Sequence, residues 1–191
     1  SEGVPAPFCA CRVCDSARKN GGRERRTKTS FQWGDSVRFD FSSDAPRQAE
    51  QYGLDYSRLR HLFFSHSHSD HCHLEDFWSR SLDVGGSLPE TLHCYGNAAV
   101  LKLFERTLEQ RLEEHRIQLH LLTPGEPVML PEREGRITPL RADHIPTEEA
   151  LLFLLETGSR RILIANDTQT FPEETLDFLR GRQLTELFID C

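Results

Sequence analysis

The stretch Ser65-His66-Ser67-His68-Ser69-Asp70-His71 directly follows an apolar segment that predicts a buried strand. Positions two apart at an extended strand end face the same side, so His66 and His68 can bind one ion. Asp70 and His71 follow where the chain turns towards a helix, and these two side chains can face a second ion nearby. Imidazole and carboxylate ligands suit Zn, Fe or Mn. A polar turn that is rich in histidine by chance is the alternative, and four ligand residues at this fixed spacing argue against it.

Two later strand-like segments end in residues of the same kinds, Asp143-His144 and Asn166-Asp167. Sheets of α/β proteins place their sites at the carboxyl ends of strands, so three strands deliver ligand types to one region. We predict that His144 completes a set of three imidazoles with the two earlier histidines, and that Asp167 bridges two cations. Taken alone, His144 is as consistent with a partly buried, hydrogen-bonded histidine.

A second cluster of ligand types is Cys9-Ala10-Cys11-Arg12-Val13-Cys14, in a segment flanked by prolines. Three cysteines in six residues cannot all be buried core thiols, and neighbours such as Cys9 and Cys11 are poorly placed for an unstrained disulfide. We predict a structural Zn held by the thiolates of Cys9, Cys11 and Cys14 and by one further ligand. A cluster of free reactive thiols is the alternative. The other cysteines, Cys72, Cys94 and Cys191, are interpreted as core residues.

The remaining segments predict α/β or α+β layers around one core, in a single domain that spans residues 1–191. Residues 1–30 lack apolar periodicity and are predicted to form a long loop that carries the zinc site. The strand over residues 37–41 alternates apolar and polar side chains and is expected to be half-buried. The final strand, over residues 187–190, is expected to be buried. The other strands are expected at residues 60–65, 91–95, 117–122, 127–130, 137–142, 151–156 and 161–165, and the helices at 45–52, 74–78, 98–114 and 173–179.

Composition excludes several classes of protein. The 191 residues contain no apolar run near the roughly 20 that a membrane span requires, and no signal peptide is evident. The net charge of −7 argues against a dedicated nucleic-acid binder. Basic residues concentrate between Arg18 and Lys28, which predicts either a solvated loop or a rim that attracts anions. Reduced thiols in a metal-binding pattern indicate the cytoplasm.

The histidine element, with an Asp40-bearing strand before it and two ligand-bearing strand ends after it, resembles the metallo-β-lactamase superfamily over essentially the whole chain. The resemblance implies an αββα-type sandwich of the α/β class. It places His66, His68 and His144 on one metal and Asp70, His71 and the bridging Asp167 on a second.

The chain also departs from that superfamily. The last histidine ligand of the family lies beyond the strand that ends at Asp190-Cys191, and Cys72-His73-Leu74 stands where many members carry a small residue and glycine. We therefore expect an incomplete fold, from a chain that continues at both ends.

Gly3-Val4-Pro5 ahead of the cysteine cluster narrows the resemblance to PhnP-type phosphodiesterases of the carbon–phosphorus lyase pathway, which are relatives of tRNA 3′-processing nucleases. The resemblance implies hydrolysis of a small phosphodiester, such as a cyclic phosphate. The attacking hydroxide would be activated by two divalent ions, Zn or Mn, and Asp70 would orient it or accept its proton. The fourth ligand of the structural Zn would be a histidine beyond Cys191.

Three alternatives stay open at this point. A tRNA-processing nuclease would carry an inserted basic arm, which the sequence lacks, so nucleic acid is a less favoured partner. Thioester and lactone hydrolases of the superfamily generally lack the cysteine cluster. A non-catalytic member would bind metal structurally and act as an interaction module. No membrane partner is expected, and a homodimer is compatible with the sequence.

Overall fold

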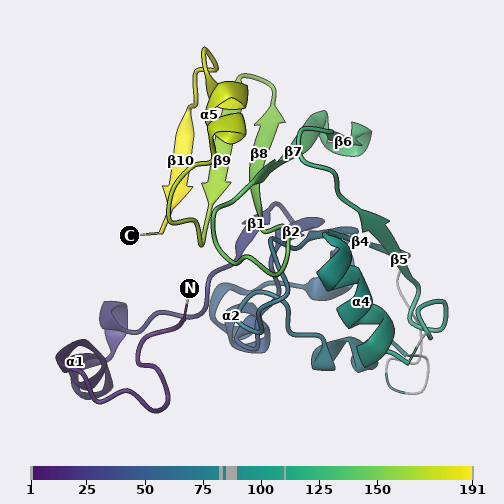
Figure 1. The fold of residues 1–191 in the computed structure, drawn as a ribbon. Helices are drawn as coiled ribbons and strands as arrows, with labels where there is room; N and C mark the ends of the chain where they lie inside the picture. The colour runs from purple at the N-terminus through teal and green to yellow at the C-terminus, as the bar shows by residue number, and fades with distance from the viewer. Residues whose placement is uncertain (1, 82–83, 85–89, 110, 191) are drawn as a thin grey trace.

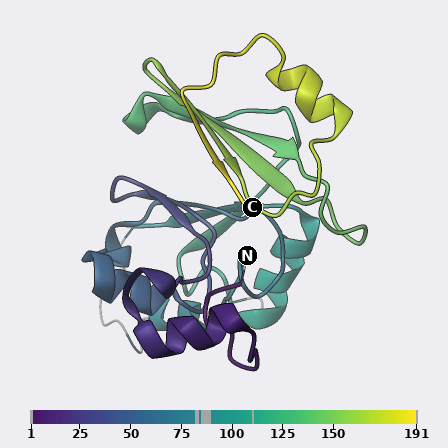
Figure 2. The same cartoon turned by 90° about the vertical axis from the view of Figure 1, so that its left-hand side faces the viewer.

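Two five-stranded sheets lie face to face in the computed structural model, which describes residues 2–81, 84, 90–109 and 111–190 (Figure 1). In the first sheet only β1 is antiparallel to its neighbour, and β2 to β5 are parallel. Helices α2 (Ala45–Tyr52) and α4 (Ala98–Thr107) cover the outer face of this sheet (Figure 2). Its strands are β1 (Phe31–Trp33), β2 (Val37–Phe39), β3 (His61–Phe63), β4 (Leu92–Gly96) and β5 (Ile117–Leu121).

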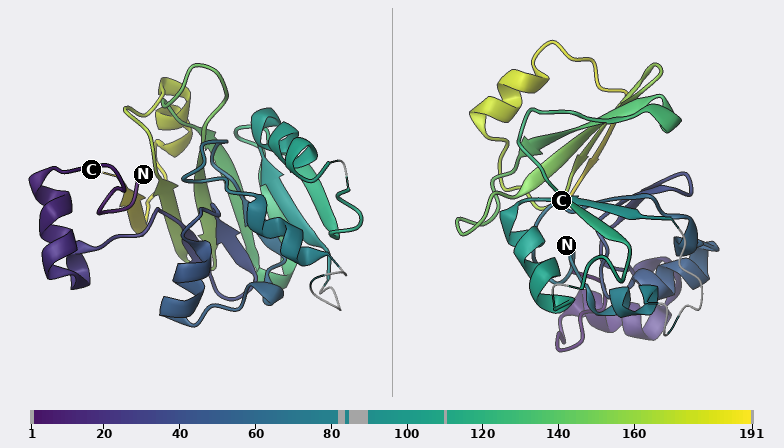
Figure 3. Two further views of the ribbon diagram at one scale, coloured as in Figure 1. Left: turned by 90° about the horizontal axis from the view of Figure 1, so that it is seen from below. Right: turned by 90° about the vertical axis from the view of Figure 1, so that its right-hand side faces the viewer.

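The second sheet is mostly antiparallel, and only β10 runs parallel to its neighbour β9. Helix α5 (Glu173–Leu179) covers its outer face, so the layers follow the order helix, sheet, sheet, helix (Figure 3). This arrangement confirms the predicted αββα sandwich. In order across the sheet, the strands are β10 (Glu186–Ile189), β9 (Arg160–Ala165), β8 (Leu151–Thr157), β7 (Gly135–Arg141) and β6 (Val128–Leu130).

Aromatic side chains fill the space between the two sheets. Phe39 of β2 lies 5.5 Å from Phe63 of β3 and 5.3 Å from Phe153 of β8, measured between ring centroids. The strand over residues 37–41 was expected to be half-buried, and this expectation is wrong because α2 covers its other face. Arg38 there is 1% exposed and donates to Gln48 of that helix.

The predicted loop over residues 1–30 contains helix α1 (Arg12–Asn20) and a 3-10 turn, η1 (Gly22–Glu24). The helix begins directly after Cys11 and buries only Cys14 and Ala17. Two buried positions in nine residues give too sparse an apolar pattern to reveal a helix in the sequence. The loop prediction is therefore wrong over this segment.

Several element boundaries also differ from expectation. Helix α4 ends at Thr107 instead of continuing to residue 114, although Leu108 and Leu112 still pack on the core from the turns that follow. The helical spacing over residues 74–78 belongs to a 3-10 helix, η3 (Glu75–Arg80). Short 3-10 helices η2 (Tyr56–Arg58) and η4 (Pro131–Arg133) complete the described elements.

The last strand was expected to be buried, but the structure shows an exposed edge. Leu187, Phe188 and Ile189 of β10 are 50%, 41% and 43% exposed, because β9 is the one described strand that pairs with β10. The interpretation of Cys72 and Cys94 as core residues is confirmed, since both are buried, and Cys191 lies outside the described residues. None of the described helices is long and apolar enough to cross a bilayer.

Candidate metal centre

Three strand ends bring the predicted ligands to one edge of the sandwich. The chain leaves β3 into the histidine stretch, β7 into Asp143-His144, and β9 into Asn166-Asp167. A main-chain hydrogen bond from Leu151 N to Ser65 O, at 2.9 Å, joins the two sheets here. Two groups of ligand atoms result, with the atoms of each group within 4.8 Å of one another: His66, His68 and His144 form one group, and His66, His71 and Asp167 form the other.

The first group has the spacing of imidazoles around a common ion. His68 Nδ1 lies 3.3 Å from His144 Nε2. Two nitrogens that each stand 2.0–2.1 Å from a tetrahedral Zn would be about 3.4 Å apart. His66 Nε2 is buried and has no hydrogen-bond partner among the described residues, and burial lowers the pKa of His66 to about 4. His66 is therefore neutral at neutral pH, with a nitrogen available to a cation.

The second group centres on one carboxylate oxygen. Asp167 Oδ2 lies 3.0 Å from His71 Nε2, 3.7 Å from His144 Nε2 and 3.8 Å from His66 Nε2. This oxygen thus faces imidazoles of both groups. Asp70 belongs to neither group as defined by the 4.8 Å limit, and its Oδ2 lies 3.5 Å from His71 Nε2.

The charges of the second group are strongly coupled. Hydrogen bonding to His71 lowers the pKa of Asp70, and it lowers the pKa of Asp167 against the opposing effect of burial. Burial also opposes the charge on His71, but Asp40 and the two other carboxylates raise the pKa of His71 to about 11. A divalent cation would replace this proton as the positive charge among the carboxylates, so its binding would release the proton.

Asp40 sets the orientation of His71. Its Oδ2 lies 2.6 Å from His71 Nδ1, and its Oδ1 accepts from Ser65 N at 2.8 Å. Asp40 has a φ of 57°, a conformation that Asp and Asn tolerate better than most residues. In the neutral form of His71, a proton held on Nδ1 leaves the Nε2 lone pair facing Asp167. In the sequence, Asp40 was noted only as part of the resemblance to a known superfamily, and no role was predicted for it.

Sequence reasoning missed two further side chains at this edge, Asn97 and Glu148. Asn97 directly follows β4, so the strand-end argument that found the other residues could have found it. Glu148 lies in the loop between β7 and β8 and accepts hydrogen bonds from Ser67 and Asn97. No local sequence signal marks Glu148, because its partners are far away in the chain.

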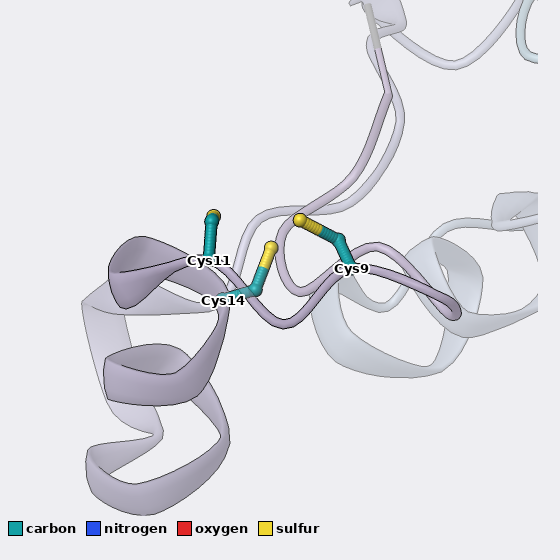
Figure 4. Close-up of side chains that lie close together, drawn as sticks. All are labelled: Cys9, Cys11 and Cys14. Carbon is teal, nitrogen blue, oxygen red and sulfur yellow. The ribbon is translucent and has the colours of Figure 1, made fainter.

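The three thiols of Cys9, Cys11 and Cys14 lie together at the start of α1, with their sulfur atoms within 4.8 Å of one another (Figure 4). A main-chain hydrogen bond from Cys14 and the neighbouring thiols lower the pKa of Cys11 to about 7. Sulfurs around a tetrahedral Zn at 2.3 Å would be about 3.8 Å apart, which fits this cluster. The sulfurs of Cys9 and Cys14 point towards each other in Figure 4.

Two of the basic residues between Arg18 and Lys28 hold the cysteine segment together. Arg18 donates to the main-chain oxygens of Ala6 and Cys9, at 2.9 and 2.5 Å. Arg25 donates to Ala17 O at 3.3 Å. These contacts favour a structural role for both residues over the anion-attracting rim that was the alternative.

The donor sets fit divalent cations at both places. The edge of the sandwich offers four imidazoles and the carboxylate of Asp167, and one buried imidazole nitrogen has no hydrogen-bond partner among the described residues; such a donor set is typical of Zn, Fe or Mn sites. The helix start offers three thiolates, which is typical of structural Zn.

The profile of the family described as "Beta-lactamase superfamily domain" matches residues 31–190, which include every predicted ligand at the edge of the sandwich. The chain belongs to the metallo-β-lactamase superfamily of hydrolases. No curated protein sequence matches the chain.

Solved structures share the metallo-β-lactamase fold with this chain. A diphosphatase from the PhnP family is 23% identical, with a TM-score of 0.74 over 99% of this chain and 68% of that one. Zn-bound PqqB from Methylobacterium extorquens is 15% identical, with a TM-score of 0.73 over 100% and 69%. The short form of human tRNase Z is 17% identical, with a TM-score of 0.58 over 78% and 66%.

Proposed function

We propose that this superfamily member is a metal-dependent phosphodiesterase whose working site holds two divalent cations. The observation that carries the proposal is the position of Asp167 Oδ2, between 3.0 and 3.8 Å from imidazole nitrogens of both ligand groups. A carboxylate oxygen shared by two groups of ligands is the arrangement expected for a pair of neighbouring cations.

The first proposed ligand set is the first group, and the second set takes His71 and Asp167 from the second group and adds Asp70, whose Oδ2 lies 3.5 Å from His71 Nε2. His66, His68 and His144 would hold one Zn or Mn ion, and Asp70, His71 and the shared Asp167 would hold the other. When bound, two such ions lower the pKa of a water molecule and neutralise charge on the oxygens of a phosphodiester.

Two carboxylates of this protein would orient the attacking water and hold a ligand histidine in the correct protonation state. Asp70 is ionised at neutral pH, as an aspartate with an ordinary pKa would be, and its hydrogen bond to His71 lowers its pKa further. It can therefore accept a hydrogen bond from the attacking water and hold that water in line with the scissile bond. Asp40 keeps the Nδ1 proton of His71 in place, so that Nε2 stays available as a ligand atom.

The substrate class rests on similarity and on charge. Of the three solved structures quoted above, the one with the highest sequence identity is a diphosphatase from the PhnP family. The cysteine cluster supports a relation to the same PhnP subgroup. The net charge of −7 disfavours a polyanionic RNA substrate. We therefore propose a small phosphodiester, such as a cyclic phosphate, as the substrate.

A separate structural site is proposed at the start of α1. Cys9, Cys11 and Cys14 would hold one Zn together with a further ligand, and Arg18 would fix the loop through its bonds to main-chain oxygens. This ion would stabilise the N-terminal segment and take no part in the reaction.

Hydrolysis of bis(p-nitrophenyl) phosphate tests the proposed reaction. His68→Ala and Asp167→Ala each remove a ligand, so kcat/KM should fall about 10²- to 10³-fold, since metal charge stabilisation is worth several kcal/mol. His73→Ala is the matched control, because this histidine follows the ligand stretch but its Nδ1 contacts Glu75 at the surface. Unchanged turnover in His68→Ala or Asp167→Ala would overturn the proposed mechanism.

A further inference from the structure

We propose that Glu148 is a positioning residue that holds His66 and His68 in register with His144. The inference rests on the proposed function, because it concerns the first ligand group of that site. Glu148 belongs to the loop between β7 and β8, four residues after His144. Its carboxylate therefore starts from the segment that carries one ligand of the group and reaches the segment that carries the other two.

The carboxylate of Glu148 accepts hydrogen bonds from Ser67, the residue between His66 and His68. The main-chain N of Ser67 donates to Oε2 at 3.1 Å and to Oε1 at 3.2 Å, and the Ser67 hydroxyl donates to Oε1 at 2.6 Å. His66 and His68 flank Ser67 directly. Fixing both the main chain and the side chain of Ser67 therefore fixes the backbone from which the two imidazoles project.

A third segment anchors the same carboxylate. Asn97 is 3% exposed, and its Nδ2 donates to Glu148 Oε2 and to Glu149 O, both at 2.8 Å. The other end of the amide caps α4, because Asn97 Oδ1 accepts from Val100 N at 3.0 Å. The orientation of the amide is thereby set, and its NH₂ group requires an acceptor where Glu148 stands.

Main-chain hydrogen bonds hold the base of this loop and also the residue before His144, where Gln169 N donates to Asp143 O at 2.8 Å. Leu151 N donates to Ser65 O and Ala142 N donates to Ala150 O, both at 2.9 Å, so the base of the loop is fixed against the first sheet. His144 lies within the loop, between these anchors. None of these main-chain bonds reaches Ser67, so the contacts of Glu148 add a direct link between the loop that carries His144 and the stretch that carries His66 and His68.

Glu148→Gln is the sharpest probe, because it preserves size and removes one acceptor. One amide oxygen of the variant can still accept from Ser67. Its NH₂ group must then face the NH₂ group of Asn97, which cannot turn round without uncapping α4. The variant therefore loosens one anchor while the loop retains its length and volume.

Binding of Co²⁺, followed by its visible absorption, measures the proposed effect independently of activity. Residues that orient metal ligands typically change metal affinity by about 10- to 100-fold, so Glu148→Gln should weaken Co²⁺ binding at the histidine group by this factor. Ser67→Ala removes one hydrogen bond and should weaken binding about 5-fold. It also serves as the test if Glu148→Gln fails to fold.

Glu149→Gln is the matched control, because its carboxylate contacts the exposed Arg141 at 2.7 Å and only its main-chain oxygen reaches Asn97. Its Co²⁺ affinity should stay within about 2-fold of the wild-type value, below the roughly 5-fold effect of a single hydrogen bond. Equal affinities in the wild type, Glu148→Gln and Ser67→Ala would overturn the role of Glu148. If the wild type and His68→Ala gave the same Co²⁺ spectrum and affinity, the metal site itself would be overturned, and with it the proposed function.

Discussion

Replacing Asp40 with Asn tests whether a single buried carboxylate holds the second ligand group together. Asp40 is 2% exposed, and its oxygens contact His71 Nδ1 at 2.6 Å, Ser65 N at 2.8 Å and Ser65 Oγ at 3.0 Å. Asn has the same shape and tolerates the φ of 57° at this position. The substitution therefore removes charge and one acceptor, with little change in backbone or volume.

The expected loss follows from these contacts. One amide oxygen can still accept from Ser65, but the NH₂ group then faces His71 Nδ1, which must give up its proton. A hydrogen bond to a charged group contributes about 1.5–3 kcal/mol, so we expect a loss of about 2–3 kcal/mol of unfolding free energy. For a chain of this size that corresponds to about 5–10 °C in Tm. His71 would then keep its remaining proton on Nε2, the atom that faces Asp167, and this proton would block ligation there.

Thermal unfolding of the metal-free protein measures the first effect, and Zn²⁺ titration measures the second. Affinity at the second site should fall about 10- to 100-fold, as for other residues that orient ligands. Asp177→Asn is the matched control, since it removes the same charge from an exposed helix position that contacts only Arg180 among the described residues. An Asp40→Asn protein whose Tm and Zn²⁺ affinity both match those of the control would refute this reasoning.

Three further predictions concern other parts of the molecule. Cys11→Ser should release one equivalent of Zn and lower Tm while leaving the metal content of the histidine groups unchanged, as measured by elemental analysis; an unchanged total Zn content would contradict the structural site. Burial lowers the pKa values of His61 and His120, so these two side chains bind fewer protons in the folded state than in the unfolded state, in which the pKa of His is about 6.5. The unfolding free energy measured with urea should therefore fall as the pH drops below about 6.5, and His120→Gln should make this pH dependence less steep. The same pH dependence in the wild type and the variant would contradict the contribution of His120. Phe153→Ala, in the core between the sheets, should cost about 3–5 kcal/mol in the same urea assay, and a loss below about 1 kcal/mol would show that the site collapses around the missing ring.

Local patterns allowed α/β or α+β layers and the ligand stretch to be predicted, whereas the order of the layers was implied by the resemblance to the superfamily. An apolar run followed by metal-ligand residue types marks the end of a strand, and this pattern recurs at His144 and at Asp167. The boundaries of α5 were predicted to the residue. Helix α1 was missed, because its stability depends on burial of Cys14 and Ala17 and on the contacts of Arg18 to main-chain oxygens of the preceding loop, none of which appears in the apolar pattern.

The sequence by itself determined which residue types stand at the strand ends, since strand formation and side-chain alternation are properties of a few neighbouring residues. Only the tertiary structure decided that Asp167 Oδ2 lies between the two ligand groups, and that Asp40 and Glu148 hold those groups in place. Glu148 is 81 residues from Ser67 along the chain, and Asp40 is 31 residues from His71. The contact of Glu148 requires the two sheets to pack, and the contact of Asp40 requires β2 to pair with β3. In both cases tertiary structure, and no local propensity, brings residues distant in the chain within hydrogen-bonding distance.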